Sequence, residues 1–260
     1  MVTSTGAAAH SRDAGEGSRA GGAAGARRSG ADEAELLSSA DVDDLTDDEL
    51  SDERLAAAAD AIVGFRHSDR WIFGTMLFSA TLSLIAAFVL SYDAVKLAAN
   101  PTAVLSCDIN SVISCGTVAL SWQASLFGFP NAFLGMVTEP VVITIAVAAL
   151  SGVRFPRWFM FTAQVVYAFG LAFALWLFSQ SMWVIGALCP WCMLITVSTS
   201  LVFLTLLHYN IRENNLYLPP AAQRRVRSWV REDYDLYAGI AFVVLLATLV
   251  LVQHGTVLFS

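Results

Sequence analysis

The chain alternates between long apolar stretches and shorter polar connections. Crossing about 30 Å of hydrocarbon as an α-helix takes about 20 consecutive apolar residues. Five stretches approach or exceed that length: 71–90, 127–150, 158–178, 183–207 and 236–252. Only the second contains a charged side chain, Glu139. The pattern predicts an all-α integral membrane protein with five transmembrane helices.

Basic residues are concentrated in alternate connections of this predicted topology. Nine arginines precede the first stretch or lie between the second and third and between the fourth and fifth: Arg66, Arg70, Arg154, Arg157, Arg212, Arg224, Arg225, Arg227 and Arg231. Lys96 alone falls on the opposite side. An excess of Lys and Arg marks cytoplasmic connections. We therefore expect a multi-pass protein of the plasma membrane with a cytoplasmic N-terminus, whose connections at 91–126 and around 179–182 are extracytoplasmic.

Composition separates an N-terminal segment from the rest of the chain. The whole chain is 56% hydrophobic and 14% charged, with a mean hydropathy of +0.60, but residues 1–60 hold 14 acidic and 5 basic side chains. Low apolar content and high charge indicate disorder. We expect three parts: a disordered, acidic cytoplasmic tail (1–60), a bundle (61–210), and a basic loop with the fifth helix (211–260). The concentrated basic face that nucleic-acid binding needs is absent from the sequence pattern.

Four cysteines fall on the predicted outer side. Cys107 and Cys115 lie in the long outer connection, eight positions apart, and Cys189-Pro190-Trp191-Cys192 lies about two turns inside the fourth stretch. Residues three apart share a helix face, so the second pair can form a disulfide. Inside a helix, Pro190 would remove a hydrogen bond to Gly186 and loosen the backbone beside the pair. A CxxC pair near a helix N-terminus also has a stabilised thiolate.

The cysteines alone leave three interpretations open. Two static disulfides would make the chain a structural membrane protein. Four thiolates could bind zinc, but with one CxxC embedded in lipid and no nearby histidine this is the weakest interpretation. A relay would pass electrons from an exposed pair to a pair at bilayer depth by thiol–disulfide exchange. An exposed pair can meet a soluble protein, and a pair in lipid can meet a lipophilic acceptor.

The order of these motifs resembles the vitamin K epoxide reductase family. The resemblance covers approximately residues 71–209 and places a cysteine pair in the first outer loop before a CxxC at the outer start of the fourth span. Its supporting residues are Cys107-Asp108, Ser114-Cys115, Ser121, Phe127-Gly128-Phe129-Pro130-Asn131-Ala132-Phe133-Leu134-Gly135 and CPWC. The order differs from that of the other bacterial quinone-linked disulfide generators, in which the CxxC comes first.

The resemblance implies a four-helix transmembrane bundle, to which the fifth transmembrane helix is added. This bundle would hold a quinone, of the menaquinone or ubiquinone type, near the CxxC. It implies that Cys189 exchanges with Cys115 and that Cys192 faces the quinone. Cys107 and Cys115 would together accept electrons from a partner thiol. These four cysteines are the expected catalytic residues.

Two further residues match family positions that bind the quinone. Asn131, four residues before Gly135, matches the quinone-contacting asparagine, and Ser121 stands at the loop Ser/Thr position. Both could polarise a quinone oxygen by hydrogen bonding. From the residues alone, each could instead cap a helix. Glu139 matches no catalytic position, and either a role in quinone protonation or a polar contact beside Pro140 is open.

We expect a quinone-dependent oxidoreductase that generates disulfides in extracytoplasmic proteins. Many bacterial members continue into a fused thioredoxin-like domain, whereas this chain stops at Ser260. The expected electron donor is therefore a separate thioredoxin-fold protein outside the membrane. A quinone or vitamin K epoxide reductase is the alternative enzyme. It is disfavoured because Thr196 stands where animal members carry a tyrosine.

Overall fold

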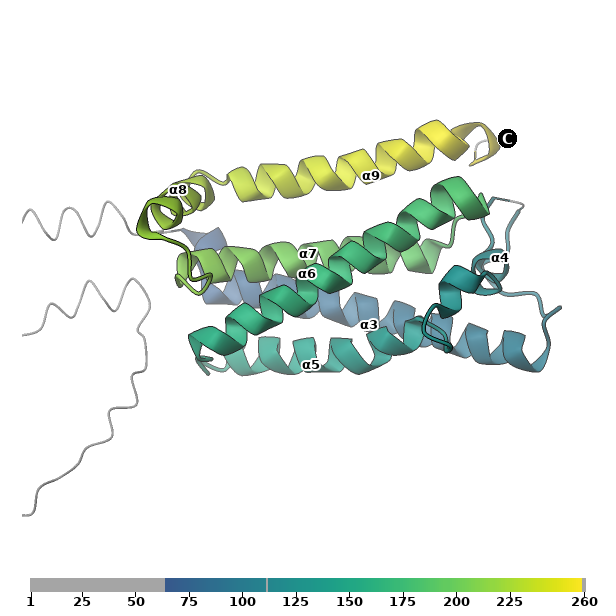
Figure 1. Cartoon of the computed structure of the whole chain (residues 1–260), viewed down its shortest axis with the longest axis horizontal. Helices are drawn as coiled ribbons and strands as arrows, with labels where there is room; N and C mark the ends of the chain where they lie inside the picture. Colours follow the sequence, from purple (N-terminus) through teal and green to yellow (C-terminus); the bar gives the residue numbers. More distant parts are fainter. Residues whose placement is uncertain (1–63, 111, 259–260) are drawn as a thin grey trace, which may run out of the picture.

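Five long helices dominate the structure (Figure 1). The computed structural model describes residues 64–110 and 112–258, without the side chains of 256–258. The long helices are α3 (Asp69–Ala99), α5 (Ala132–Leu150), α6 (Arg157–Gln180), α7 (Pro190–Arg212) and α9 (Tyr234–Leu258). Each is long and apolar enough to cross a membrane. This confirms the predicted all-α membrane protein; the predictions for residues 1–60 lie outside the described residues.

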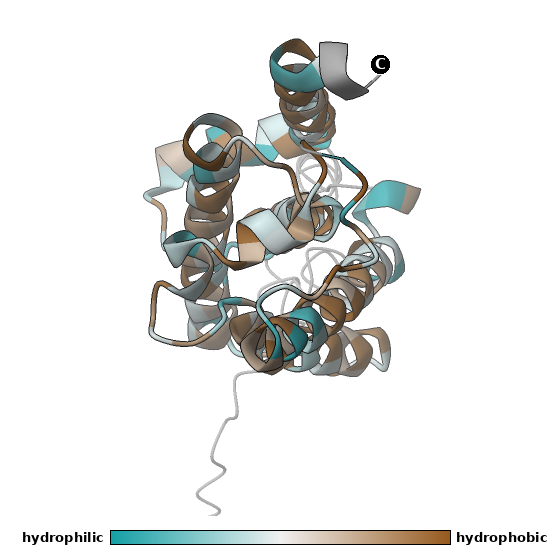
Figure 2. Ribbon diagram, turned by 90° about the vertical axis from the view of Figure 1, so that its right-hand side faces the viewer, coloured by the Kyte–Doolittle hydropathy of each residue, from teal (hydrophilic) through white to brown (hydrophobic). Residues whose placement is uncertain are grey.

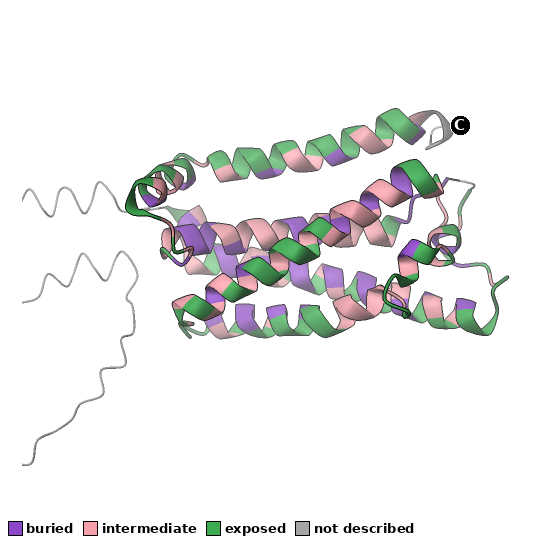
Figure 3. Ribbon diagram, in the orientation of Figure 1, coloured by how far each residue is buried: buried purple, intermediate pink, exposed green. Residues whose placement is uncertain are grey.

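Four of these helices form a bundle and the fifth lies along its side. Helices α3, α5, α6 and α7 pack together, and the short helix α8 (Pro220–Arg231) leads from α7 to α9 (Figure 1). Helix α3 is the most buried of the five spans and α9 the least. Figure 3 shows the difference as a mostly exposed surface along α9. The fifth helix is therefore an addition to a four-helix core, as predicted.

The bundle is apolar on its outside. Figure 2, viewed from the end that carries α4 (Cys115–Ala119), shows that hydrophobic residues make up most of the long helices. Large exposed apolar side chains lie on α3, α5, α6 and α9, including Phe78, Phe88, Val141, Phe169 and Leu245. A continuous apolar exterior on this scale is typical of a surface in contact with lipid.

Small residues bring α3 and α5 close together. A Cβ atom added to Gly135 would lie 2.8 Å from the Cβ of Ala87, which is closer than real Cβ contacts come. Ala80 and Ala146 are fully buried in the same core. In lipid, helices associate mainly by close van der Waals contact, which small side chains permit. Gly135 is therefore required where the two helices approach.

The predicted starts of two helices were wrong. Helix α5 begins at Ala132 rather than at 127, because Gly128 has φ 81° and Pro130 disfavours helix at the residue before it. The chain between α6 and α7 forms a π-helical turn at Ser181–Ile185 and a left-handed Gly186 with φ 71°, and α7 begins only at Pro190. The CxxC pair thus lies at a helix start, not two turns inside. Pro190 occupies the first helical position, where no amide hydrogen is needed.

Helix α3 continues nine residues beyond the predicted span, to Ala99. Its 31 residues are about 46 Å long at 1.5 Å per residue, whereas the hydrocarbon layer is about 30 Å thick. The final turns carry Asp93 and Lys96, which the sequence placed in the outer loop. These turns reach the same end of the bundle as the cysteines.

A polar cluster at the opposite end fixes α9 to the bundle. His67 Nδ1 lies 3.0 Å from His208 Nε2, and His208 Nδ1 lies 2.7 Å from the Asp235 carboxylate on α9. Arg66 binds the same carboxylate at 2.5 Å. Burial, assisted by the neighbouring His208 and Arg66, lowers the pKa of His67. A neutral His67 can share the hydrogen bond with His208 without placing two positive rings side by side.

Candidate functional site

A β-bridge aligns the first loop with the start of α7. Ile113 pairs in parallel with Leu188; the Leu188 amide donates to the Val112 carbonyl at 2.6 Å, and the Ser114 amide donates to the Leu188 carbonyl at 3.1 Å. In a parallel pair the residues that follow on each segment also lie near one another. Cys115 and Cys189 come immediately after this bridge, so the backbone brings them together.

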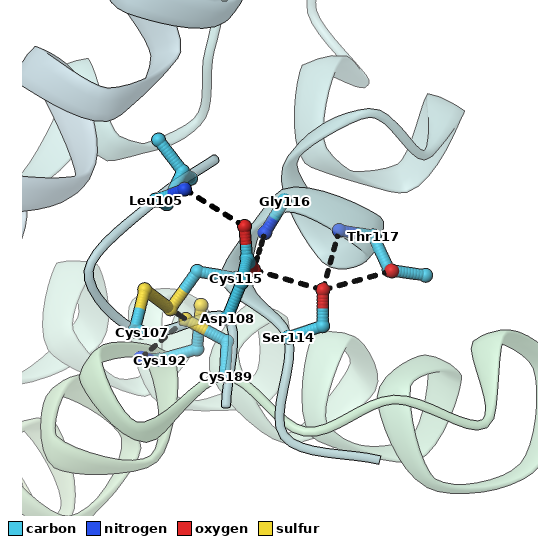
Figure 4. Close-up of a disulfide and its surroundings, with 9 residues drawn as sticks. All are labelled: Leu105, Cys107, Asp108, Ser114, Cys115, Gly116, Thr117, Cys189 and Cys192. Carbon is cyan, nitrogen blue, oxygen red and sulfur yellow. Dashed lines mark hydrogen bonds between the residues drawn. A yellow bond between two sulfur atoms is a disulfide. The ribbon is translucent and has the colours of Figure 1, made fainter. Parts of the chain in front are cut away.

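All four cysteines meet at this point (Figure 4). Cys107 and Cys115 form a disulfide, while Cys189 and Cys192 are free thiols. The Cys189 sulfur lies 3.3 Å from the Cys115 sulfur. Cys107, Cys115 and Cys189 belong to one buried cluster, and Cys192 packs against it partly exposed. With the sulfurs of Cys107 and Cys115 joined in a disulfide, the thiols of Cys189 and Cys192 are the two that remain free. The geometry suits exchange between the pairs.

Cys189 is activated by its position at the first turn of α7. It is the N-cap residue, and its sulfur accepts a hydrogen bond from the Cys192 amide at 3.4 Å. A hydrogen bond from the Cys192 thiol lowers the pKa of Cys189; burial opposes this, and the amides of Cys192 and Trp191 add to it. The helix N-terminus also favours negative charge. The thiolate is the species that attacks a disulfide.

Asp108 fixes the shape of the disulfide loop. Its carboxylate accepts hydrogen bonds from the Leu105 amide, the Gly116 amide and the Ser114 hydroxyl, each at 2.9 Å (Figure 4). A Cβ atom on Gly116 would lie 3.0 Å from this carboxylate, so a larger residue would crowd it. Desolvation acts to raise the pKa of Asp108, but the hydrogen bonds from Gly116, Leu105 and Ser114 prevail and leave the pKa below its ordinary value.

We expect Asp108→Ala to loosen the loop and expose the Cys107–Cys115 disulfide to reduction. Because the folded-state pKa is lowered, the carboxylate stabilises the loop above the ordinary value of 3.8 and loses this effect as the pH falls below it. Each orphaned donor costs about 1–3 kcal/mol, so reduction by a dithiol at pH 7 should be at least about fivefold faster.

The measurement uses a Cys189→Ser background, in which the inner thiol cannot exchange. Thr117→Ala is the matched control, because the Thr117 hydroxyl contacts Ser114 and not the carboxylate. Equal reduction rates for Asp108→Ala and Thr117→Ala would contradict the role given to Asp108.

Ser121 and Asn131, the predicted quinone-binding residues, stand at N-cap positions but do not cap. Ser121 precedes η3 (Trp122–Ser125), and its hydroxyl donates to the Val118 carbonyl at 2.6 Å. Asn131 precedes α5, and its amide donates to the Gln123 carbonyl at 2.6 Å. Neither side chain therefore caps its helix, which was the alternative interpretation of both residues. Their quinone contacts remain predictions.

The free atoms of Asn131 fit a quinone. Bonding to the Gln123 carbonyl identifies the amide nitrogen and leaves it one further hydrogen. The Asn131 Oδ1 atom is buried and has no partner among the described residues. A donor suits a quinone oxygen, and an acceptor suits the hydroxyl of the reduced form. This unsatisfied amide is the feature of the described chain that matches the implied cofactor.

Glu139 lies in a polar contact between three helices. Its carboxylate accepts hydrogen bonds from the Ser83 hydroxyl of α3 at 2.9 Å and from the Tyr167 hydroxyl of α6 at 3.1 Å. Glu139 itself is on α5 and is buried. Of the two open interpretations, this geometry favours the polar contact.

The sequence pattern assigns no role to Asp108 or Leu188, although both shape the site. Aspartate side chains in loops commonly hydrogen-bond to nearby backbone, and this is the signal that could identify Asp108. Leu188 has an ordinary apolar side chain that indicates no role in the site. Its backbone pairing with Ile113 can be recognised only in the three-dimensional structure. Among the described residues, no three His, Cys, Asp or Glu side chains form a group that could hold a metal ion.

Comparison with known proteins agrees with this site. Residues 75–207, just over half of the chain, match the vitamin K epoxide reductase family. A comparison with curated proteins gives no match. The matched region includes the disulfide loop and the CxxC pair. Membership of this family means a membrane oxidoreductase whose reactions are associated with quinones. The chain belongs to the vitamin K epoxide reductase family.

Proposed function

We propose that the protein oxidises the thiols of an extracytoplasmic thioredoxin-fold protein and passes the electrons to a membrane quinone, so generating protein disulfides. The observation that carries this proposal is the 3.3 Å separation between the sulfurs of Cys115 and Cys189, one in a disulfide and one free. That separation lets the outer pair exchange directly with the inner pair. Two static disulfides would leave no free thiols.

The proposed relay proceeds in four exchanges. A donor thiolate attacks the Cys107–Cys115 disulfide and forms a mixed disulfide. The second thiol of the donor then attacks that bond, so the donor leaves with a disulfide and both loop cysteines become thiols. The Cys115 thiolate then attacks a Cys189–Cys192 disulfide and forms a Cys115–Cys189 bond while Cys192 leaves. Cys107 next attacks Cys115, which restores the loop disulfide and releases Cys189. The structure corresponds to this last state, with the outer pair oxidised and the inner pair reduced.

The inner pair must then be reoxidised. A bound quinone supplies this chemistry by accepting two electrons and two protons. Cys192 is the partly exposed member of the inner pair, and Asn131 offers a free donor and a free acceptor. Thr196 donates to the Cys192 carbonyl at 3.0 Å, so its hydroxyl is already bonded to the helix backbone. This supports quinone rather than an epoxide as the substrate.

The direction of electron flow follows from the proposed orientation. The nine arginines belong to the segment around the start of α3, the connection from α5 to α6, and the connection from α7 to α9 with α8. These segments lie at the end of the bundle opposite α4, which begins at Cys115 (Figure 1). By the positive-inside rule we assign the arginine end to the cytoplasm and the cysteine end to the outside of the plasma membrane. New disulfides are formed in that oxidising compartment. A separate donor protein can reach the loop pair there.

The test is a reconstituted assay with the full chain in liposomes that contain menaquinone. A reduced thioredoxin-fold protein is added outside, and oxidation of its thiols is followed together with the absorbance of the quinone. We expect one quinone reduced for each donor disulfide formed. Cys115→Ser and Cys189→Ser should each reduce both signals to the background rate of liposomes without protein.

Two comparisons separate the alternatives. Liposomes without quinone should give at most two donor disulfides for each protein molecule, one for each of its two cysteine pairs. Replacing menaquinone by vitamin K epoxide and the donor by a small dithiol tests the reductase alternative through its product. Unchanged donor oxidation in Cys115→Ser or Cys189→Ser would overturn the proposed function.

A further inference from the structure

Cys189 needs a proton partner in the proposed relay. This inference rests on the proposed function, in which Cys189 is alternately a disulfide sulfur and a free thiol. Its exposed fraction is 0%, so water does not reach the residue directly. A thiolate left in an apolar environment is costly unless it is stabilised or protonated. A group of the protein that exchanges a proton with this sulfur would remove that cost.

Asp93 is placed to be that group. It lies on α3 between Leu90, three residues before it, and Leu97, four residues after it, so the three side chains share one helix face. Both leucines pack in or against the cluster that contains Cys107, Cys115 and Cys189. The face of α3 that carries Asp93 is therefore the face turned toward the cysteines.

The Asp93 carboxylate is buried and incompletely bonded. Its exposed fraction is 4%, and its Oδ2 atom has no hydrogen-bond partner among the described residues. Its charge interacts electrostatically with Cys189. A buried, unpartnered carboxyl oxygen is uncommon, and each instance calls for an explanation. Proton exchange with the neighbouring sulfur supplies one.

The other ionisable groups around Asp93 do not replace it. Lys96, one turn later on α3, and Asp108, in the loop, both interact electrostatically with Asp93. Asp108 is already bonded by three donors, and Lys96 lies over the ring of Tyr92 at 5.9 Å from its centre. From α7, the two thiols Cys189 and Cys192 complete the titratable set. Asp93 is the member of this set with an oxygen free to bond.

We propose that Asp93 gives a proton to Cys189 when the loop disulfide is restored and takes it back when the inner pair is reoxidised. In the first step, Cys107 attacks Cys115, the Cys107–Cys115 bond forms, the Cys115–Cys189 bond breaks, and Cys189 leaves with the bonding electron pair. The Asp93 carboxylic acid protonates that sulfur and becomes a carboxylate. In the second step, Cys189 forms its bond with Cys192, and the quinone of the proposed relay accepts the two electrons that are released. The Cys189 proton returns to the carboxylate, and the quinone takes its two protons from Cys192 and from solvent. Asp93 itself is neither oxidised nor reduced.

The experiment measures donor oxidation by the full chain in menaquinone liposomes as a function of pH. Turnover needs both forms of Asp93, so the wild-type rate should pass through a maximum. Asp93→Asn cannot exchange the proton. We expect its rate at the wild-type maximum to be about 100-fold lower and the maximum itself to disappear. Asp93→Glu should restore a maximum with a higher rate than Asp93→Asn.

Ser91→Ala is the matched control. Ser91 is buried on the same helix, and its hydroxyl also has no partner among the described residues. Its removal should leave the rate and its pH dependence unchanged. A second readout tests packing: in a Cys107→Ser/Cys192→Ser background, oxidation should join Cys115 to Cys189 equally with and without the Asp93→Asn substitution, because that product depends on position alone.

The outcomes separate this inference from the proposed function. Donor oxidation that is absent in the wild-type protein would overturn the proposed function, and this inference with it. Normal wild-type activity with an unchanged rate in Asp93→Asn would overturn the inference alone. A rate lowered equally at every pH, together with less Cys115–Cys189 product, would assign Asp93 a packing role and also overturn it.

Discussion

Replacing Cys107 and Cys192 together by serine should convert the relay into a single covalent bond between Cys115 and Cys189. These two cysteines would be the only ones left, and their sulfurs lie 3.3 Å apart in the native arrangement. A mild oxidant should join them nearly completely, because neither resolving thiol remains to break the bond. Donor oxidation should fall to the rate without protein. Peptide mapping by mass spectrometry without reduction identifies the new disulfide.

The matched control is the Cys115→Ser/Cys192→Ser variant, which leaves Cys107 and Cys189. The bridge between Ile113 and Leu188 aligns Cys115, not Cys107, with Cys189. We therefore expect much less disulfide under the same oxidant. Equal yields in the two double variants would mean that the loop is not held in register, and the proposed order of exchange would be wrong.

The sequence predicted the number and class of the helices because lipid imposes a simple rule. A span must be apolar over about 20 residues, and the five stretches satisfy this condition. It could not predict where α7 begins. Residues 181–189 are as apolar as the helices on either side, so hydropathy does not change at the break. The break depends on the left-handed Gly186 and on Pro190 at the first helical position.

The sequence predicted which cysteines belong to the candidate site, but it did not predict how the surrounding backbone arranges them. The four cysteines could be predicted as site residues from their thiol chemistry and from the CxxC spacing. The exchange between Cys115 and Cys189 was implied by the family resemblance. Asp93 was missed because a polar residue after an apolar stretch indicates a loop. The extension of α3 to Ala99 places it on a buried helix face instead. The burial of Asp93 results from tertiary packing, which no local pattern in a single sequence reveals.

Glu139 presents the opposite case, since its sequence signal suggested function and its contacts suggest structure. An ionisable residue inside a span is a functional candidate by default. Its carboxylate accepts hydrogen bonds from Ser83 and Tyr167, so it connects α5 to α3 and α6. A side chain whose oxygens are both bonded by neighbouring helices is suited to holding those helices together.

We expect Glu139→Leu to be strongly destabilising. The Ser83 and Tyr167 hydroxyls would lose their acceptor, at a cost of about 1–3 kcal/mol for each group left buried without a partner. The free energy of unfolding, measured by denaturant titration in detergent micelles, should fall by at most the combined cost of the two hydroxyl groups. Thr138→Val is a control on the same helix, since the Thr138 hydroxyl is exposed and bonds to the backbone of its own helix.

The triple variant Glu139→Leu/Ser83→Ala/Tyr167→Phe separates a structural from a protonic role. Removing all three polar partners leaves no unsatisfied group, so stability should return most of the way to that of the wild type. If the carboxylate only joins helices, donor oxidation should return as well, because no proton passes through it. Restored stability without restored turnover would contradict the structural assignment. It would make Glu139 a second proton-exchanging carboxyl, deeper in the bundle than Asp93.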